Sequence, residues 1–309
     1  MSTPPVTEPA VPDAAPLLEA RGITMRFGGL TAVDGVDLTV KHSEIVGLIG
    51  PNGAGKTTFF NCLTGLYVPT EGEVRLDGAP LPARPARVTR AGVARTFQNI
   101  RLFANMTALE NVIVGRHTRT SAGLLSAIGR GPRYRREERE SRSRAMELLA
   151  FVGLAGQESV LARNLSYGAQ RRLETARALA SEPRLLLLDE PTAGMNPQET
   201  RETEELVHAI RDQGVAVLVI EHDMRFIMSL CDRVAVLVQG AKLTEGAPGD
   251  VQADERVVEA YLGAPDDPPP APDDPPPGSG GPGAAGDTVA RQGADTRHST
   301  SRGSRETAI

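Results

Sequence analysis

The chain has no apolar stretch long enough to cross a membrane. A bilayer span needs roughly 20 apolar residues, and the longest runs here are short ones such as residues 185–188 and 215–220. Only two cysteines occur, Cys62 and Cys231, and their spacing does not indicate a metal site. We expect both to be small core residues in a reducing compartment. The first residues also lack the cationic and apolar regions of a secretory signal. These absences predict a cytoplasmic protein that depends on partners for any work at a membrane.

Two segments have too few large apolar residues to form a packed core. Residues 1–16 are rich in proline, and residues 264–309 are rich in Pro, Gly, Asp and Ser. We expect both tails to be disordered, because they cannot bury enough apolar surface to offset the entropy of ordering. The folded body is then residues 17–263. The net charge of −5 argues against a nucleic-acid binder that depends on bulk positive charge.

Short buried strands alternate with helices along this body, which predicts an α/β fold with a mostly parallel, helix-covered sheet. The expected strands of that sheet include residues 44–49, 185–188, 215–220 and 234–238. Before them, residues 17–49 are typical of strands separated by hairpin turns, one at Gly28 and Gly29 and another at Asp34 and Gly35. The expected helices include residues 56–66, 107–116, 168–181 and 255–262, and one that Asn196 caps and Gly214 ends.

A glycine-rich loop follows the first buried strand and matches G-x-x-x-x-G-K-[ST]. It consists of Gly50, Pro51, Asn52, Gly53, Ala54, Gly55, Lys56, Thr57 and Thr58. Glycines let the backbone N–H groups face a phosphate, and the helix that follows adds positive potential. In this pattern Lys56 reaches the β- and γ-phosphates of ATP, and Thr57 binds Mg²⁺. A chance glycine-rich turn is the alternative, but such a turn seldom has the correct strand before it and helix after it.

Two carboxylates, Asp189 and Glu190, end the apolar strand 185–188. Ligands bind at the carboxyl ends of the strands in open α/β sheets. We therefore expect Asp189 to hold Mg²⁺ and Glu190 to polarise the attacking water. The simpler interpretation is that both side chains cap a helix start before Pro191.

With these motifs in this order, residues 17–263 resemble the ATPases of ATP-binding cassette (ABC) transporters. The resemblance implies a P-loop NTPase fold: an ABC nucleotide-binding domain with a mostly parallel core sheet, an antiparallel β subdomain and a helical subdomain at about residues 99–166. It also implies that Gln98 is the Q-loop glutamine, in contact with Mg²⁺ or the lytic water, that His222 is the switch histidine, and that Phe27 stacks on adenine. Each has a simpler interpretation: a surface amide for Gln98, a helix cap or a satisfied histidine after a buried strand for His222, and a core residue for Phe27.

Residues 165–172, LSYGAQRR, resemble the signature segment of this family. Ser166 and Gly168 would lie at a helix start, where backbone N–H groups bind anionic oxygens. The family solution is a head-to-tail dimer in which each signature closes over the partner's ATP. The sequence differs from the commonest signature, LSGGQ, at Tyr167 and Ala169, and Asn196 stands where the D-loop has aspartate.

Further stretches are similar to the importer ATPases for branched-chain amino acids, among them residues 25–33, 95–103 and 260–263. This resemblance implies two transmembrane permeases, a second identical or different ATPase subunit and an extracytoplasmic solute-binding protein as partners, at the cytoplasmic side of the membrane. The ATPases of urea or short-chain amide importers and of lipopolysaccharide exporters are the nearest alternatives. A soluble ATP-gated clamp usually has two cassettes or a coiled-coil insertion, and a non-hydrolysing module would be expected to lack Glu190 or His222.

Overall fold

Ten strands form two sheets in residues 15–116 and 132–262, the part of the chain that this computed structural model describes. The expected disordered tails therefore lie almost wholly outside the described residues. The smaller sheet is antiparallel, in the order β2-β1-β4-β5, and consists of β1 (Leu18–Phe27), β2 (Leu30–Val40), β4 (Glu71–Leu76) and β5 (Ala79–Pro80). This confirms the antiparallel part of the predicted fold.

The larger sheet has the order β10-β9-β3-β8-β7-β6, and only its edge strand β10 is antiparallel to its neighbour. Its strands are β3 (Ile45–Ile49), β6 (Val93–Arg95), β7 (Leu185–Asp189), β8 (Ala216–Ile220), β9 (Arg233–Val238) and β10 (Ala241–Gly246). The mostly parallel core sheet is therefore confirmed. Every residue of β3, β7 and β8 is buried, which explains their nearly continuous apolar sequences.

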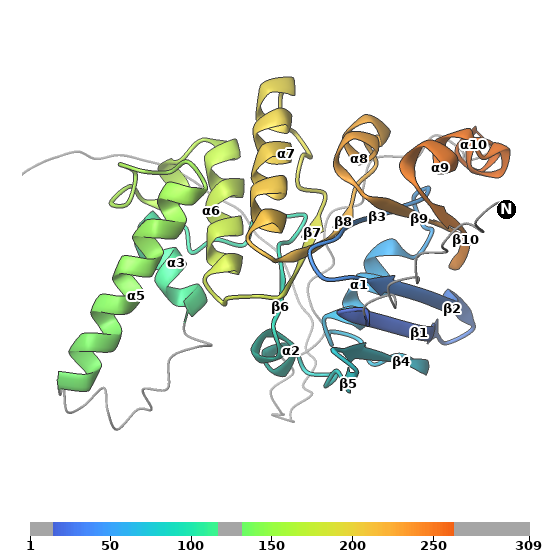
Figure 1. The fold of residues 1–309 in the computed structure, drawn as a ribbon, viewed down its shortest axis with the longest axis horizontal. Helices are drawn as coiled ribbons and strands as arrows, with labels where there is room; N and C mark the ends of the chain where they lie inside the picture. The colour runs from blue at the N-terminus through green and yellow to red at the C-terminus, as the bar shows by residue number, and fades with distance from the viewer. Residues whose placement is uncertain (1–14, 117–131, 263–309) are drawn as a thin grey trace, which may run out of the picture. The chain divides into compact units, whose positions relative to one another are not determined.

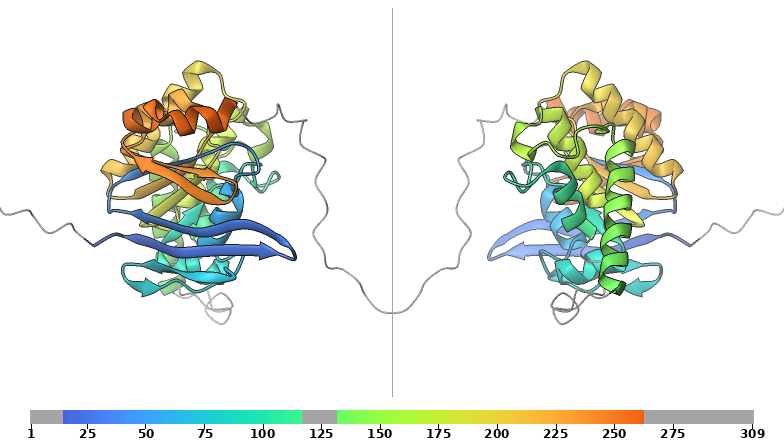
Figure 2. Two further views of the ribbon diagram at one scale, coloured as in Figure 1. Left: turned by 90° about the vertical axis from the view of Figure 1, so that its right-hand side faces the viewer. Right: turned by 90° about the vertical axis from the view of Figure 1, so that its left-hand side faces the viewer.

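Alternate residues of these central strands contribute to two separate cores. Leu186 and Leu188 of β7 belong to one core, and Leu185 and Leu187 to the other, because successive side chains of a strand point to opposite faces. The second core lies between the two sheets and includes α1 (Lys56–Leu63) and α2 (Pro85–Ala91). Figure 2 shows the smaller sheet, in blue and cyan, on the side of the larger sheet where this second core lies.

The remaining helices lie on the other side of the larger sheet (Figure 1). They are α3 (Ala108–Arg116), α5 (Pro132–Phe151), α6 (Tyr167–Leu179), α7 (Pro197–Asp212), α8 (Met224–Leu230), α9 (Pro248–Ala253) and α10 (Glu255–Leu262), with the short 3-10 helix η1 (Ala162–Asn164) before α6. Helices α3 and α5 pack against α6, within or next to the expected helical subdomain, and the sheet is covered by the others. The limits of that subdomain, and those of the body 17–263, stay a prediction. No helix of the described ranges is long and apolar enough to span a bilayer.

The predicted turn at Asp34 and Gly35 was wrong, because both residues lie inside β2. Gly35 has a left-handed backbone (φ 58°), and the pairing of β1 with β2 shifts register in this region, so the strand continues through an irregularity. The Gly35 N–H donates to Thr24 Oγ1 at 2.9 Å and is satisfied there. The helix predicted at residues 56–66 ends three residues earlier, where Gly65 turns left-handed (φ 68°). The short helices α2 and α9 were not predicted.

Candidate nucleotide-binding and catalytic site

The predicted phosphate-binding loop, residues 50–58, connects the buried strand β3 to α1. Helix α1 begins at Lys56, and its N-cap residue Gly55 has a left-handed backbone (φ 95°) and makes no side-chain cap bond. The first N–H groups of α1 are therefore left for an anion, which the helix dipole also favours. Close packing restricts the loop to glycine as well. A Cβ on Gly50 would lie 2.0 Å from a backbone oxygen of β9, and one on Gly55 would lie 2.3 Å from a backbone oxygen of β2.

The Lys56 side chain folds back over this loop. Its Nζ donates hydrogen bonds to the carbonyl oxygens of Gly50, at 2.7 Å, and Pro51, at 3.0 Å. Burial lowers the pKa of Lys56, whereas the negative charges of Glu190 and Asp189 raise it. The ammonium group is therefore within electrostatic reach of both carboxylates, so the loop and the end of β7 form one site.

Asp189 ends β7 in a buried ion pair that the sequence did not predict. Its Oδ2 accepts a hydrogen bond from an Arg95 terminal nitrogen at 2.6 Å, and the side chains of Arg95 and Asp189 are only 7% and 6% exposed. Arg95 also donates to Asn61 Oδ1 at 2.7 Å, and its guanidinium carbon lies 5.5 Å and 5.3 Å from the ring centroids of Phe60 and Phe97. These contacts fix the orientation of Asp189 at the edge of the sheet. The only sequence signal for Arg95 is its place three residues before Gln98.

Glu190, the residue after β7, has a left-handed backbone with φ of 47°. Few residues other than glycine adopt this conformation, and it concentrates at functional sites. The Glu190 N–H donates to the Ile220 carbonyl oxygen of β8 at 2.9 Å. Its Oε2 accepts a hydrogen bond from Gln98 Nε2 at 2.9 Å. The structure thus brings together two residues that stand 92 positions apart and that separate motifs had predicted to be catalytic.

His222 follows β8 at the same edge of the sheet. Its side chain is 64% exposed, and its Nδ1 lies 3.5 Å from Glu221 Oε2. Glu221 is buried and accepts hydrogen bonds from the N–H and the hydroxyl of Thr192, at 2.9 Å and 2.5 Å. It thereby joins the segment after β8 to the segment after β7. The exposed imidazole excludes a buried, fully satisfied histidine, and its catalytic role stays a prediction.

Phe27 is not a core residue, because it is 42% exposed at the end of β1. Its ring contacts that of Tyr67 edge to face, with the ring centroids 5.4 Å apart. Tyr67 is itself 37% exposed, and no sequence motif pointed to it. The two rings form an accessible aromatic surface that a flat base can contact. Stacking of adenine on Phe27 stays a prediction.

The signature residues Ser166 and Gly168 lie at the start of α6, as predicted. Ser166 is the N-cap, and its side chain accepts a hydrogen bond from the Ala169 N–H at 3.3 Å. Gly168 packs so closely on α7 that a Cβ would lie 2.6 Å from Glu199 Oε1. In Figure 1, α6 and α1 lie on opposite sides of β7. The structure therefore does not bring the signature to the phosphate-binding loop of the same chain.

Asn196, at the D-loop position, caps α7. Its Oδ1 accepts hydrogen bonds from the N–H groups of Gln198, at 2.9 Å, and Glu199, at 3.0 Å. The Glu199 side chain accepts in return from the Asn196 N–H, which completes a capping box. This confirms the predicted cap, and Pro197 follows in the first turn.

Tyr261 of α10 lies near the start of the phosphate-binding loop, and its buried phenol oxygen has no hydrogen-bond partner among the described residues. The sequence did not predict this proximity. Burial raises the pKa of the Tyr261 phenol, although the nearby N–H of Gly50 lowers it. The residue belongs to the stretch 260–263, which is similar to the importer ATPases for branched-chain amino acids. Proximity over this distance in sequence leaves no local signal.

Thr57, Gln98 and Asp189, the residues predicted to hold Mg²⁺, provide oxygen ligands, the type that this ion takes. Thr57 and Gln98 are exposed, and Asp189 is buried at the strand end. In the described ranges, no three His, Cys, Asp or Glu side chains cluster as metal ligands. Such a cluster is not required, because Mg²⁺ is commonly held by one or two carboxylates together with substrate phosphates. The residues therefore fit a magnesium ion that binds with the nucleotide.

Comparison with known proteins identifies the family of the chain. The profile of the ABC transporter family matches residues 33–193, and a profile of the branched-chain amino acid ATP-binding cassette transporters matches residues 241–267. The chain is 48% identical over 250 residues to the high-affinity branched-chain amino acid transport ATP-binding protein BraF of Pseudomonas aeruginosa. The aligned residues are 80% of this chain and 98% of BraF.

Two solved structures show the same fold. One is the ADP conformation of an ATP-binding cassette of an ABC transporter, with a TM-score of 0.72 and 30% identity over 81% of this chain and 100% of that one. The other is a dimeric ATP-binding cassette in a post-hydrolysis state bound to ADP and Pi, with a TM-score of 0.63 and 27% identity over 75% of this chain and 98% of that one. The chain therefore belongs to the ABC transporter family, as one of the nucleotide-binding subunits that hydrolyse ATP.

Proposed function

We propose that this chain is the ATP-hydrolysing subunit of an importer for branched-chain amino acids. The observation that carries the proposal is the match of residues 241–267 to the profile of branched-chain amino acid transporters, because this segment lies outside the general ABC match at 33–193. The identity with BraF, which extends over 98% of that protein, supports the same branch.

In this proposal the loop 50–58 wraps the phosphates of ATP. Its free N–H groups at the start of α1 bind the phosphate oxygens. Lys56, which donates to two carbonyl oxygens of its own loop, moves its ammonium group onto the β- and γ-phosphates. Phe27 stacks on the adenine, and Tyr67 supports the ring from its edge.

Hydrolysis depends on the carboxylates at the end of β7 and on their partners. Glu190 polarises the attacking water, and Gln98, which already donates to Glu190, orients the same water. Thr57, Gln98 and Asp189 hold Mg²⁺, which neutralises phosphate charge when it is bound. His222 completes the site from the end of β8.

The signature acts on the ATP of a second ATPase subunit in a head-to-tail dimer, homomeric or heteromeric. Ser166 and Gly168 lie at a helix start, where N–H groups favour anions, and a solved relative is itself dimeric with ADP and Pi. Two permeases and an extracytoplasmic solute-binding protein complete the assembly. The chain then works as a peripheral subunit on the cytoplasmic face of the membrane, without nucleic acid.

The test is to purify the tagged chain with its membrane partners and to reconstitute the complex in vesicles. We expect ATP-dependent uptake of radiolabelled leucine, isoleucine or valine that requires a binding protein. Urea and short-chain amides serve as the comparison substrates. Uptake of those compounds alone, or co-purification with an exporter and no binding protein, would contradict the proposed substrate while leaving the ATPase assignment intact.

A further inference from the structure

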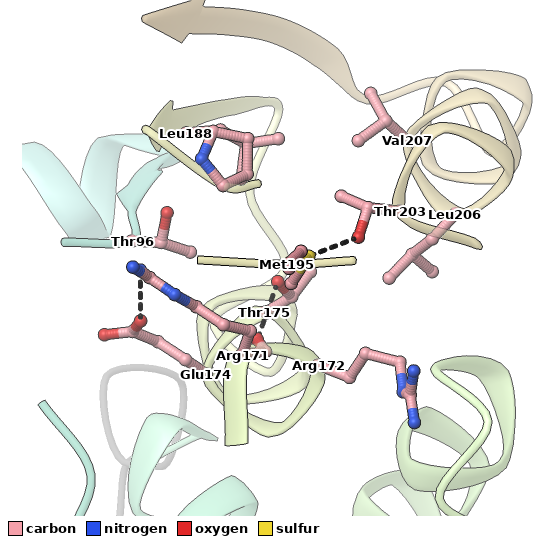
Figure 3. Close-up of a pocket in the computed structure, with 11 residues that line it drawn as sticks. Thr96, Arg171, Arg172, Glu174, Thr175, Leu188, Met195, Thr203, Leu206 and Val207 are labelled. Atoms are coloured by element: carbon pink, nitrogen blue, oxygen red, sulfur yellow. Dashed lines mark hydrogen bonds and ion pairs between the residues drawn. The ribbon is translucent and has the colours of Figure 1, made fainter. Parts of the chain in front are cut away.

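Helix α6 presents a row of polar side chains to the segment around Gln98. Tyr167, Arg171 and Glu174 recur at intervals of four and three residues, so they share one face of the helix. Arg171 and Glu174 are almost fully buried, with side-chain exposures of 6% and 1%. Figure 3 shows the two side chains next to each other beside Thr96, in a pocket between α6 and α7. Buried charges in such a row need a structural or functional reason.

Arg171 binds the backbone of the Q-loop, defined here as residues 95–98. One terminal nitrogen donates to the Phe97 carbonyl oxygen at 2.8 Å, and the other donates to the Gln98 carbonyl oxygen at 2.5 Å. The planar guanidinium thus spans two successive carbonyls, which the single ammonium group of a lysine cannot do in the same way. The backbone of the loop is thereby attached to the signature helix.

Tyr167 in turn orients Arg171. Its phenol oxygen accepts hydrogen bonds from Arg171 Nε at 3.2 Å and from a terminal nitrogen at 2.9 Å. The guanidinium carbon also lies 5.4 Å from the centre of the Tyr167 ring. The ring also lies close to the turn before Asn196, where a Cβ on Gly194 would lie 3.5 Å from it. The side chain at position 167, where the commonest signature has only glycine, therefore lies between Arg171 and the turn at Gly194.

Glu174 anchors the same segment one turn further on. It accepts a hydrogen bond from the Arg101 N–H at 3.2 Å, and its second oxygen lies 3.9 Å from Arg171. Burial raises the pKa of Glu174, against the opposing charges of Arg177 and Arg171. Arg177 donates to the Arg101 carbonyl oxygen, so α6 binds both the N–H and the carbonyl group of Arg101.

We propose that Arg171, oriented by Tyr167, is a positioning residue that sets where the Gln98 amide meets Glu190. The contacts are continuous: Tyr167 holds Arg171, Arg171 holds the Gln98 carbonyl, and the Gln98 side chain donates to Glu190. This inference rests on the proposed function, in which Gln98 and Glu190 act on the water. A movement of the signature helix then changes the position of the Gln98 amide relative to the catalytic carboxylate.

The test compares Arg171→Met and Arg171→Lys in the full-length chain with Arg172→Met as the matched control. Arg172 is the next residue of α6 but pairs with Glu202 of α7, at 2.9 Å. We expect Arg171→Met to lower kcat between about 10- and 100-fold, the cost of a small misplacement of a catalytic group. Arg171→Lys should recover only part of this loss. The KM for ATP should change less than about threefold in both, because the phosphate-binding loop is untouched.

Amide hydrogen exchange gives a readout that does not depend on turnover. Residues 96–102 should exchange faster in both Arg171 variants and at the normal rate in Arg172→Met. Tyr167→Phe keeps the ring and removes one hydrogen-bonding oxygen, so it is the mild variant in case Arg171→Met folds poorly. We expect it to lower kcat about two- to tenfold, because Arg171 loses both hydrogen bonds to the phenol oxygen, and to lower the melting temperature by only about 1–6 °C. If the kcat of Arg171→Met and the exchange rate of its residues 96–102 equal those of Arg172→Met, the proposal is overturned.

A double variant tests whether Arg171 acts through Gln98. In a Gln98→Ala background, Arg171→Met should lower kcat by no more than about a further twofold, since residues in one network are not additive. A full-size loss in both backgrounds would show that Arg171 acts elsewhere and would overturn the proposal. If Gln98→Ala alone keeps normal turnover, the proposed role of Gln98 fails instead. Hydrogen exchange of residues 96–102 then still decides whether Arg171 holds the loop.

Discussion

Replacing Arg95 with methionine removes the cation of a buried ion pair and leaves Asp189 without its partner. The two side chains are 7% and 6% exposed, and their hydrogen bond is 2.6 Å long. Removing one member of such a pair costs about 3–5 kcal/mol, because an uncompensated charge stays buried. For a folded body of this size, each kcal/mol lowers the melting temperature by about 2–4 °C. We therefore expect Arg95→Met to melt about 6–20 °C below the wild type.

Thermal unfolding followed by far-UV circular dichroism measures this shift, since the chain contains no tryptophan for fluorescence. Arg144→Met is the matched control. Arg144 pairs with Glu147 on the surface of α5 at 3.0 Å, with exposures of 41% and 58%, and such pairs contribute only about 0.2–1 kcal/mol. The double variant Arg95→Met with Asp189→Asn should recover most of the lost stability, because the isolated charge is gone. A shift for Arg95→Met no larger than that of Arg144→Met would refute the reasoning.

Two further predictions concern a buried carboxyl and the phosphate-binding loop. Burial raises the pKa of Glu174 above its ordinary 4.5, so the stability that it contributes is complete below the ordinary value and is lost as the pH rises through the folded-state pKa. In melts at several pH values, the stability of the wild type relative to Glu174→Gln should fall as the pH rises above 4.5; a constant difference would contradict this. Gly53→Ala should cost about 1–2 kcal/mol for its left-handed backbone alone. Gly55→Ala should cost more stability and abolish ATP binding, because its Cβ would also lie 2.3 Å from a backbone oxygen. If Gly53→Ala and Gly55→Ala lose equal stability in melts and equal affinity in ATP titrations, the steric argument is excluded.

Local patterns in the sequence predicted much of the fold. The central strands were recognisable because β3, β7 and β8 are buried on both faces and are apolar at almost every position. The start of α7 was predicted because Asn196 and Pro197 form a local cap. The prediction of a turn at Gly35 was wrong, since a glycine with a left-handed backbone occurs in an irregular strand as well as in a hairpin.

Residues of the site could be predicted only where they belong to a recognisable sequence motif. Lys56 and Glu190 were predicted in this way, and burial lowers the pKa of Lys56 against the smaller, opposite effect of the Glu190 charge. The partners of Asp189 and Gln98 were not found, because each depends on a contact over a long sequence distance: Arg95 binds Asp189 across 94 positions, and Arg171 binds the Gln98 carbonyl across 73. A single arginine in a sequence carries no information about which carboxylate or carbonyl it binds.

The most direct test of this account is the ATPase rate of Glu190→Gln, a substitution that keeps the shape of the side chain and removes its charge. If Glu190 polarises the attacking water, turnover should fall on the order of 10²–10³-fold, the usual cost of one transition-state stabiliser. Equilibrium binding of ATP should persist, because Lys56 and the loop 50–58 are unchanged, and the ATP-bound dimer should accumulate. Turnover at the wild-type rate would contradict the assignment of Glu190 as the catalytic base.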